Sequence, residues 1–268
     1  MSTPRFEIIA ENLYRLKVPF ENIYTAVFLI KGTDGYMLVD CATTKEDVAQ
    51  TILPAITDLN IKNEEITHIL ITHPHGDHAG GLRHLLTYLP DAVVCAGSDF
   101  IKERLLPKHF VRVSDGENID KSVVAVSLPG HCTDMMGYYD TRNETLITGD
   151  AVQLCGVGRY GCGLGSFASY FNTLEKIEKM RPSTLVASHD YYPRGAIARG
   201  DGEINAYLCD SREYAFYIKR ECERGIDENM VDSALITERI KQKNAEVDVQ
   251  IPPLQRSTVH NCLCEILN

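Results

Sequence analysis

The sequence predicts an α+β fold, and three patterns along the chain support that prediction. Residues 7–39 alternate apolar and polar side chains in short runs around an Asp34-Gly35 turn, which is typical of antiparallel strands. The middle of the chain alternates strand-like and helix-like runs. The last quarter has helical periodicity only. We therefore predict a mixed domain over residues 1–201 and a small helical domain over residues 202–268.

Local signals place the individual elements. Thr43 or Thr44 caps a helix that runs to about Leu59, because apolar residues recur there at helical spacing. The β-branched, apolar run Ile66–Thr72 predicts a buried strand. Further strands are expected at 92–95, near 109–113 and 122–128, and at 135–140, 145–148 and 184–190. Further helices are expected at 82–89, at 99–106 with Ser98 as cap, from Ser166, at 203–224 with a stop at Gly225, at 227–244, and from Ser257 or Thr258.

Composition limits the kind of protein this is. A hydrophobic content of 44% in 268 residues is enough for a full core and excludes a disordered chain. The net charge of −10 opposes binding to nucleic acid and to anionic membranes. The amino terminus lacks a signal-peptide pattern, and no apolar run approaches membrane-spanning length. We expect a cytoplasmic protein with a small-molecule substrate; a homodimer is left open.

The chain contains nine cysteines, an odd number at irregular spacing. Without a secretory signal, this usage favours reduced thiols over a disulfide framework. Most of them are expected to be small buried hydrophobic residues.

His73-Pro74-His75-Gly76-Asp77-His78 places four potential metal ligands in six residues, directly after the predicted strand Ile66–Thr72. Catalytic groups of layered α/β proteins gather at the carboxyl ends of strands. Two imidazoles one residue apart can converge on one cation. A carboxylate and a third imidazole can then reach a neighbouring cation, as sites with two metals about 3.5–4 Å apart require. The motif predicts the first half of a two-metal hydrolytic site.

Three more candidate ligands lie at the ends of predicted strands: His131 after a Pro-Gly turn, then Asp150 and His189. Imidazole and carboxylate ligands suit zinc, manganese or iron. The expected sets are His73, His75 and His131 on one ion, and Asp77, His78 and His189 on the other, with Asp150 bridging the two.

The order of these residues resembles the metallo-β-lactamase superfamily, in which an Asp after a strand, an HxHxDH motif, a later His, a later Asp and a final His supply the site. The matching positions are Asp40, His73 to His78, His131, Asp150 and His189. The resemblance implies a four-layer αββα sandwich with a small C-terminal helical appendage. It also implies that Asp40 holds the loop His73–His78, the ligand loop, without binding metal. Ser188 stands where a glycine is common before the last histidine.

By the same resemblance, the protein is a metal-dependent hydrolase, similar to glyoxalase II in size and layout. Two divalent ions, zinc as first choice and iron or manganese as alternatives, hold a bridging hydroxide in such a site. Asp77 is expected to orient that hydroxide and accept its proton, and Asp150 to fix the distance between the ions. The expected substrate is a small ester, thioester or lactone.

Other functions within the family remain open. Ile147–Ala151, Gly156–Arg159 and His189–Tyr191 look like the persulfide dioxygenase branch, where two His and one Asp hold a single iron. Some RNA-processing phosphodiesterases carry a helical C-terminal domain like residues 202–268, although the net charge argues against that branch. Flavin-linked diiron relatives usually carry a glutamate where His75 stands. A non-catalytic binding protein is disfavoured because the ligand set is complete.

The sequence also suggests residues around the ligands. Residues 156–165 contain five glycines but lack the Gly-Lys-Ser/Thr ending of a phosphate-binding loop, so we expect a flexible loop beside the site. Arg159, Tyr160 and Tyr191 are expected in loops just after ligands and are candidate substrate contacts. The histidines expected to be structural or solvent-facing are His68, His84, His109 and His260.

Overall fold

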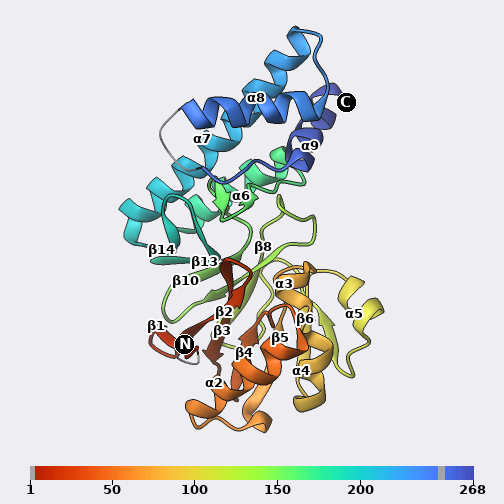
Figure 1. The fold of residues 1–268 in the computed structure, drawn as a ribbon. Coiled ribbons are helices and arrows are strands. Elements are labelled where there is room, and N and C mark those ends of the chain that lie inside the picture. Colours follow the sequence, from red (N-terminus) through yellow and green to blue (C-terminus); the bar gives the residue numbers. More distant parts are fainter. Residues whose placement is uncertain (1–3, 247–250) are drawn as a thin grey trace. The chain divides into compact units, whose positions relative to one another are not determined.

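The computed structural model describes residues 4–246 and 251–268; Met1–Thr3, the start of the amino-terminal segment considered above, lie outside the described residues. The chain divides into two units, each with strands and helices (Figure 1). Unit 1 contains residues 1–127 and 136–149, and unit 2 contains residues 128–135 and 150–268. The division at residues 201 and 202 stays a prediction.

Unit 1 is built on a seven-stranded sheet whose strands follow one another in chain order. Its strands are β1 (Glu7–Ala10), β2 (Leu13–Phe20), β3 (Ile23–Lys31), β4 (Tyr36–Val39), β5 (Ile66–Leu70), β6 (Val93–Ala96) and β7 (Phe110–Arg112). The first four pair antiparallel, which confirms the predicted meander, and β4 to β7 pair parallel. Parallel neighbours need crossover connections, and the helices of unit 1 lie in these connections.

The helical segments of unit 1 are α1 (Lys45–Asp47), a π turn η1 (Val48–Ile52), α2 (Leu53–Asp58), the short 3-10 helix η2 (Asn63–Glu65), α3 (Gly76–Ala79), α4 (Leu82–Tyr88) and α5 (Phe100–Leu105). Thr44 begins the first of them with a capping box, because its hydroxyl accepts from Asp47 N–H and the Asp47 carboxylate accepts from Thr44 N–H. Buried apolar residues of η1, α2 and α4 form one core with β2 to β6. The cap of α5 is Asp99 rather than the predicted Ser98.

The described part of unit 1 also contains three antiparallel strands: β8 (Val123–Ser127), β9 (Met136–Asp140) and β10 (Thr145–Gly149). Tyr138 of β9 is fully buried, and its hydroxyl donates to the carbonyl of Ile71 at 2.9 Å. Met136 N–H donates to the carbonyl of Thr72 at 2.8 Å. These bonds fix the chain where it leaves β5, and the ligand loop begins there.

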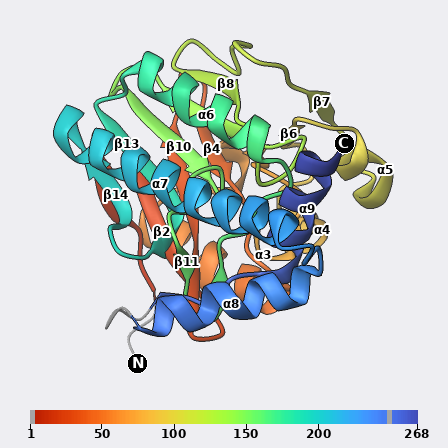
Figure 2. The ribbon, with the colours of Figure 1, turned by 90° about the horizontal axis from the view of Figure 1, so that it is seen from above.

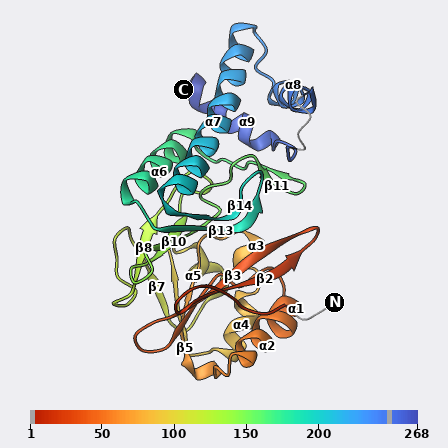
Figure 3. The ribbon, with the colours of Figure 1, turned by 90° about the vertical axis from the view of Figure 1, so that its left-hand side faces the viewer.

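The described residues of unit 2 form two hairpins and four helices. They are β11 (Gly156–Val157), β12 (Tyr160–Gly161), α6 (Phe167–Met180), β13 (Thr184–Tyr191), β14 (Gly195–Arg199), α7 (Gly200–Asp227), α8 (Ser233–Glu246) and α9 (Arg256–Leu267). A helix begins after Ser166 as predicted, and the Ser166 side chain caps it. Helices α6 and α7 lie side by side in Figure 2, and Figure 3 shows α9 beside α7 and α8, which it contacts. Strand β14 was not predicted.

Gly225 does not end its helix, and that prediction is wrong. Helix α7 continues to Asp227, so α8 begins at Ser233 instead of Asp227. A Cβ atom at Gly225 would lie 2.6 Å from Ile236 Cδ1 and 2.8 Å from the carbonyl oxygen of Met230. The glycine therefore permits close packing of α7 against the start of α8.

Two expectations from the composition, on the cysteines and on membrane-spanning helices, can be compared with the described residues. The nine cysteines, all within the described ranges, are free thiols. Within residues 4–246 and 251–268, none of the helices combines the length and apolar character that crossing a bilayer would require.

Gly80 and Gly76 allow a matched test of packing behind the ligand loop. A Cβ at Gly80 would clash with the backbone carbonyl of Thr43, whereas a Cβ at Gly76 would meet nothing within 4 Å. We expect Gly80→Ala to lower the free energy of unfolding by about 2 kcal/mol or more, because backbone must shift. Gly76→Ala is expected to change it by less than about 1 kcal/mol. Urea unfolding followed by circular dichroism measures both, and equal effects would contradict this packing.

Candidate metal centre

The loop after β5 brings two imidazole rings together. His73 Nε2 lies 3.0 Å from His75 Nδ1, and the ring of His73 is buried. Two nitrogens that bind one zinc ion at about 2.0–2.1 Å in tetrahedral geometry are about 3.4 Å apart, so the observed spacing is near that of two ligands on one ion. Pro74 between them keeps the chain extended, and His75 then stands at the N-cap of α3.

Asp40 holds the same loop through hydrogen bonds. It follows β4, has no exposed surface, and accepts from Thr72 N–H and the Thr72 hydroxyl, each at 2.8 Å. Its Oδ2 also lies 2.8 Å from His78 Nδ1. Because a carboxylate can only accept, Nδ1 of His78 carries the proton and Nε2 has a lone pair for a metal.

Thr72 fixes the tautomer of His73 in a similar way. Its hydroxyl proton goes to Asp40, so its oxygen accepts from His73 Nδ1 at 3.1 Å. His73 Nε2 is thereby the nitrogen with the lone pair. Neither Thr72 nor its role was predicted from the sequence, although its place immediately before the motif was a usable signal.

Asp77 points back toward the sheet of unit 1. Its Oδ2 accepts from the hydroxyl of Thr25 in β3 at 3.1 Å and lies 3.4 Å from His78 Nε2. Thr25 stands 52 residues before Asp77, and no local pattern pointed to it.

Unit 2 assembles the other three predicted ligands around Asp150. One carboxylate oxygen, Oδ1, lies 3.4 Å from His189 Nε2, and the other, Oδ2, lies 4.0 Å from His131 Nε2. Asp150 and His189 are buried. His131 follows the Pro129-Gly130 turn, Asp150 follows β10, and His189 lies near the end of β13. Each oxygen of one carboxylate thus faces a different imidazole.

The tautomer of His131 is set by a backbone carbonyl. His131 Nδ1 donates to the oxygen of Gly163 at 2.6 Å. Gln153 lies at the same place, where its Oε1 accepts from Gly163 N–H at 2.6 Å and its Nε2 is 2.9 Å from His131 Nδ1. Because the carbonyl can only accept, Nδ1 carries the proton, the Gln153 NH2 group makes no hydrogen bond to it, and Nε2 of His131 faces Asp150. Gln153 and Gly163 were not predicted as site residues.

The glycine-rich stretch is not the flexible loop that we predicted. It forms the β11–β12 hairpin and a buried segment, Gly161–Leu164, whose backbone is hydrogen-bonded to side chains. The prediction failed because glycine was taken as a sign of mobility, whereas here it permits close packing.

The three candidate substrate contacts differ in exposure. Arg159 is exposed in the hairpin turn, and its guanidinium lies 5.3 Å from the ring centroid of the half-buried Tyr160. Tyr191 belongs to β13 rather than to a loop and is only 2% exposed. Its ring stands edge-on to that of His189, with centroids 5.6 Å apart. Substrate binding by these residues stays a prediction.

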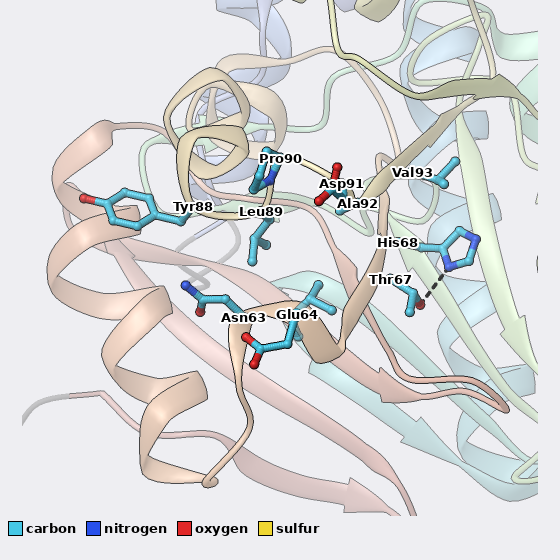
Figure 4. A pocket seen from close by; sticks show the side chains of 11 residues that line it. Asn63, Glu64, Thr67, His68, Tyr88, Leu89, Pro90, Asp91, Ala92 and Val93 are labelled. Atoms are coloured by element: carbon cyan, nitrogen blue, oxygen red, sulfur yellow. Dashed lines mark hydrogen bonds between the residues drawn. The ribbon is translucent and has the colours of Figure 1, made fainter.

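His68 lies away from the ligand loop. Figure 4 shows its ring beside Thr67, whose hydroxyl is 2.9 Å from Nδ1. It lines a cavity of about 520 Å³ between η2, the amino end of β5 and the α4–β6 connection, whereas the ligands follow the carboxyl end of β5. Burial lowers the pKa of His68, so the ring is neutral at pH 7.

The donor sets fit divalent metal. Unit 1 offers three imidazoles and one carboxylate, and unit 2 offers two imidazoles and one carboxylate. In His73, His78 and His131 the nitrogen away from the metal side is held by an oxygen acceptor, which is the usual support of metal-binding histidines. Each oxygen of Asp150 lies near a different histidine, an arrangement that a carboxylate shared by two ions can use.

Comparison with known proteins gives a consistent family. Residues 22–189 match the model of the metallo-beta-lactamase superfamily. Protein YobT of Bacillus subtilis is 32% identical over 164 residues, which cover 50% of this chain and 70% of YobT. A hydroxyacylglutathione hydrolase of Prochlorococcus marinus is 25% identical, with 68% of this chain and 70% of the relative covered. An atrochrysone carboxyl ACP thioesterase of Aspergillus fumigatus is 27% identical over 66% of this chain but only 42% of its own length.

Solved structures show the same fold. A B3 metallo-beta-lactamase with an active-site glutamic acid matches with a TM-score of 0.57 and 22% identity, covering 80% of this chain and 88% of that one. A flavoprotein of Thermotoga maritima matches with a TM-score of 0.63 and 18% identity, covering 85% of this chain and 70% of that one. At such identities the likeness concerns the fold alone. The predicted α+β sandwich class is confirmed.

Proposed function

This chain belongs to the metallo-beta-lactamase superfamily and is a metal-dependent hydrolase, and from that premise we propose that it hydrolyses a small thioester at a dinuclear metal centre. The ligands that we propose are His73, His75 and His131 for one ion, Asp77, His78 and His189 for the other, and Asp150 for both. Small oxygen esters and lactones are the neighbouring substrate classes.

The observation that carries the proposal is the placement of Asp150. Its two oxygens face two different histidines, at 3.4 and 4.0 Å. Two histidines and one carboxylate could also hold a single iron, but such a site would leave out Asp77 and His78, whose Oδ2 and Nε2 atoms lie 3.4 Å apart. The larger donor set therefore favours two ions over the single iron of the persulfide dioxygenase alternative.

When bound, two divalent ions supply Lewis acidity and lower the pKa of water from 15.7 to about 7. The chain supplies the orientation. Thr25 donates to the Asp77 carboxylate, and the proposed role of Asp77 is to orient the attacking water and accept its proton. Asp40 and Thr72 hold His78 and His73 with their lone pairs on Nε2. We propose zinc as the metal and a cytoplasmic location, which the nine free thiols support.

The choice of a thioester rests on two arguments. The names of two relatives, an ACP thioesterase and a hydroxyacylglutathione hydrolase, describe acyl groups attached to thiol carriers. In addition, a thiol with a pKa of about 8.5 leaves as a thiolate near neutral pH, so departure needs no proton donor. This suits a site whose polar side chains are mainly metal ligands.

Metal removal and a substrate panel test the proposal. We expect about two zinc, manganese or iron ions per chain purified without added metal, and chelation should lower thioester hydrolysis at least about 100-fold, with recovery on adding metal. The panel pairs acyl-glutathione and acyl-pantetheine thioesters with oxygen esters of the same acyl groups, a lactone and a phosphodiester. Preference for the phosphodiester would contradict the substrate. One iron per chain with oxygen consumption on persulfides would favour the dioxygenase.

A further inference from the structure

We propose that the C-terminal helix α9 positions His131, acting through the segment Gly161–Gly165. Thr258 of α9 is then a positioning residue for one metal ligand, although it stands 127 positions after that ligand in the sequence. The inference deepens the proposed function and rests on His131 being a metal ligand.

Helix α9 binds the segment on both sides of Gly163. The Thr258 hydroxyl donates to the carbonyl of Cys162 at 2.7 Å and accepts from Leu164 N–H at 3.1 Å. Asn261 Nδ2 donates to the carbonyl of Leu164 at 2.8 Å. Thr258 has no exposed surface. One buried hydroxyl thus fixes the residues immediately before and after Gly163.

The segment in turn holds His131. The Gly163 carbonyl accepts from His131 Nδ1 at 2.6 Å, and its N–H donates to Gln153 Oε1 at 2.6 Å. Gly165 N–H donates to the carbonyl of Gly130, the residue before His131, at 2.8 Å. The orientation of the His131 ring therefore depends on where the backbone of Gly163 lies.

The glycines explain how the segment Gly161–Gly165 packs closely against both the chain before α9 and the loop that carries His131. A Cβ at Gly161 would clash with the carbonyl of Pro253, in the chain that leads into α9. A Cβ at Gly163 would lie 3.1 Å from the Gln255 side chain, and one at Gly165 would lie 2.9 Å from the His131 carbonyl. The segment is packed between the approach to α9 and the His131 loop.

Variants of two buried threonines, Thr258 and Thr237, distinguish an effect on His131 from a general loss of stability. Thr258→Val removes the hydroxyl that binds both neighbours of Gly163, and Thr258→Ser keeps it. Thr237 of α8 is also buried, but its hydroxyl donates to the carbonyl of Ser233 in its own helix, so Thr237→Val is the control. Asn261→Ala removes a less buried contact to the same segment. His131→Ala gives the reference for loss of the ligand.

The full-length variants are compared by competition of bound zinc with a chromogenic chelator, by the absorption spectrum after cobalt(II) substitution, and by kcat and KM. We expect Thr258→Val to lower the binding affinity for the more loosely held ion about 10-fold and to change the cobalt spectrum. It should also lower kcat with little change in KM. Asn261→Ala should shift the same readouts in the same direction by a smaller factor. Thr258→Ser should restore them, and Thr237→Val should lower only thermal stability.

Wild-type zinc affinity and cobalt spectrum in Thr258→Val would overturn the inference, as would equal effects in Thr237→Val. If Thr258→Val does not fold, the same readouts on Asn261→Ala decide, and unchanged values overturn it. Unchanged metal binding in His131→Ala would refute His131 as a ligand. A wild-type chain that lacks thioesterase activity, but loses zinc on Thr258→Val, would refute the proposed substrate and support the positioning role.

Discussion

Asp150→Asn is expected to lower kcat at least about 100-fold and to reduce bound metal from about two ions per chain to about one. The amide keeps the size of the side chain, but one of the two metal-facing atoms becomes an NH2 group with no lone pair to donate. Since Asp150 faces both His131 and His189, the change is expected to affect both proposed ions rather than one alone. Elemental analysis and steady-state kinetics on thioesters measure both effects.

Asp190→Asn is the matched control, because Asp190 is an exposed carboxylate next to His189 in β13. We expect near wild-type metal content and rate. If Asp150→Asn retained two tightly bound ions and more than about a tenth of the wild-type rate, Asp150 would not bridge them.

Asp40→Asn is expected to lower the free energy of unfolding by about 2–3 kcal/mol and to weaken metal binding about 10-fold or more. The Asp40 carboxylate accepts from Thr72 N–H, the Thr72 hydroxyl and His78 Nδ1. An amide has one oxygen, so its NH2 must face one of these donors in a buried place. The ligand loop then loses its fixed geometry.

Asp120→Asn separates the two effects. The Asp120 carboxylate also accepts from backbone N–H groups, those of Thr33, Ser122 and Val123, but it contacts none of the proposed ligands in these bonds. We expect lower stability with unchanged metal content. Equal loss of metal in both variants would mean that Asp40 acts through general stability and not through His78.

Much of the fold followed from local sequence. The antiparallel meander, the buried strand before the ligand motif and the caps at Thr44 and Ser166 depend on alternation and capping between near neighbours. Two predictions that rested on glycines were wrong. Gly225 and the Gly161–Gly165 segment were read from local propensity alone, but close contacts with distant residues decide their conformation.

The sequence by itself determined the family, the fold class and the candidate ligands, because ligand type, order and spacing along the chain are visible without coordinates. Only the tertiary structure decided how those ligands are held. Thr25, Gln153, Gly163 and Thr258 carry no local signal, since each acts on a residue that is distant in sequence or through a backbone atom common to every residue. A hydrogen bond that fixes an imidazole depends on distance and direction in space, and the folded backbone alone supplies both.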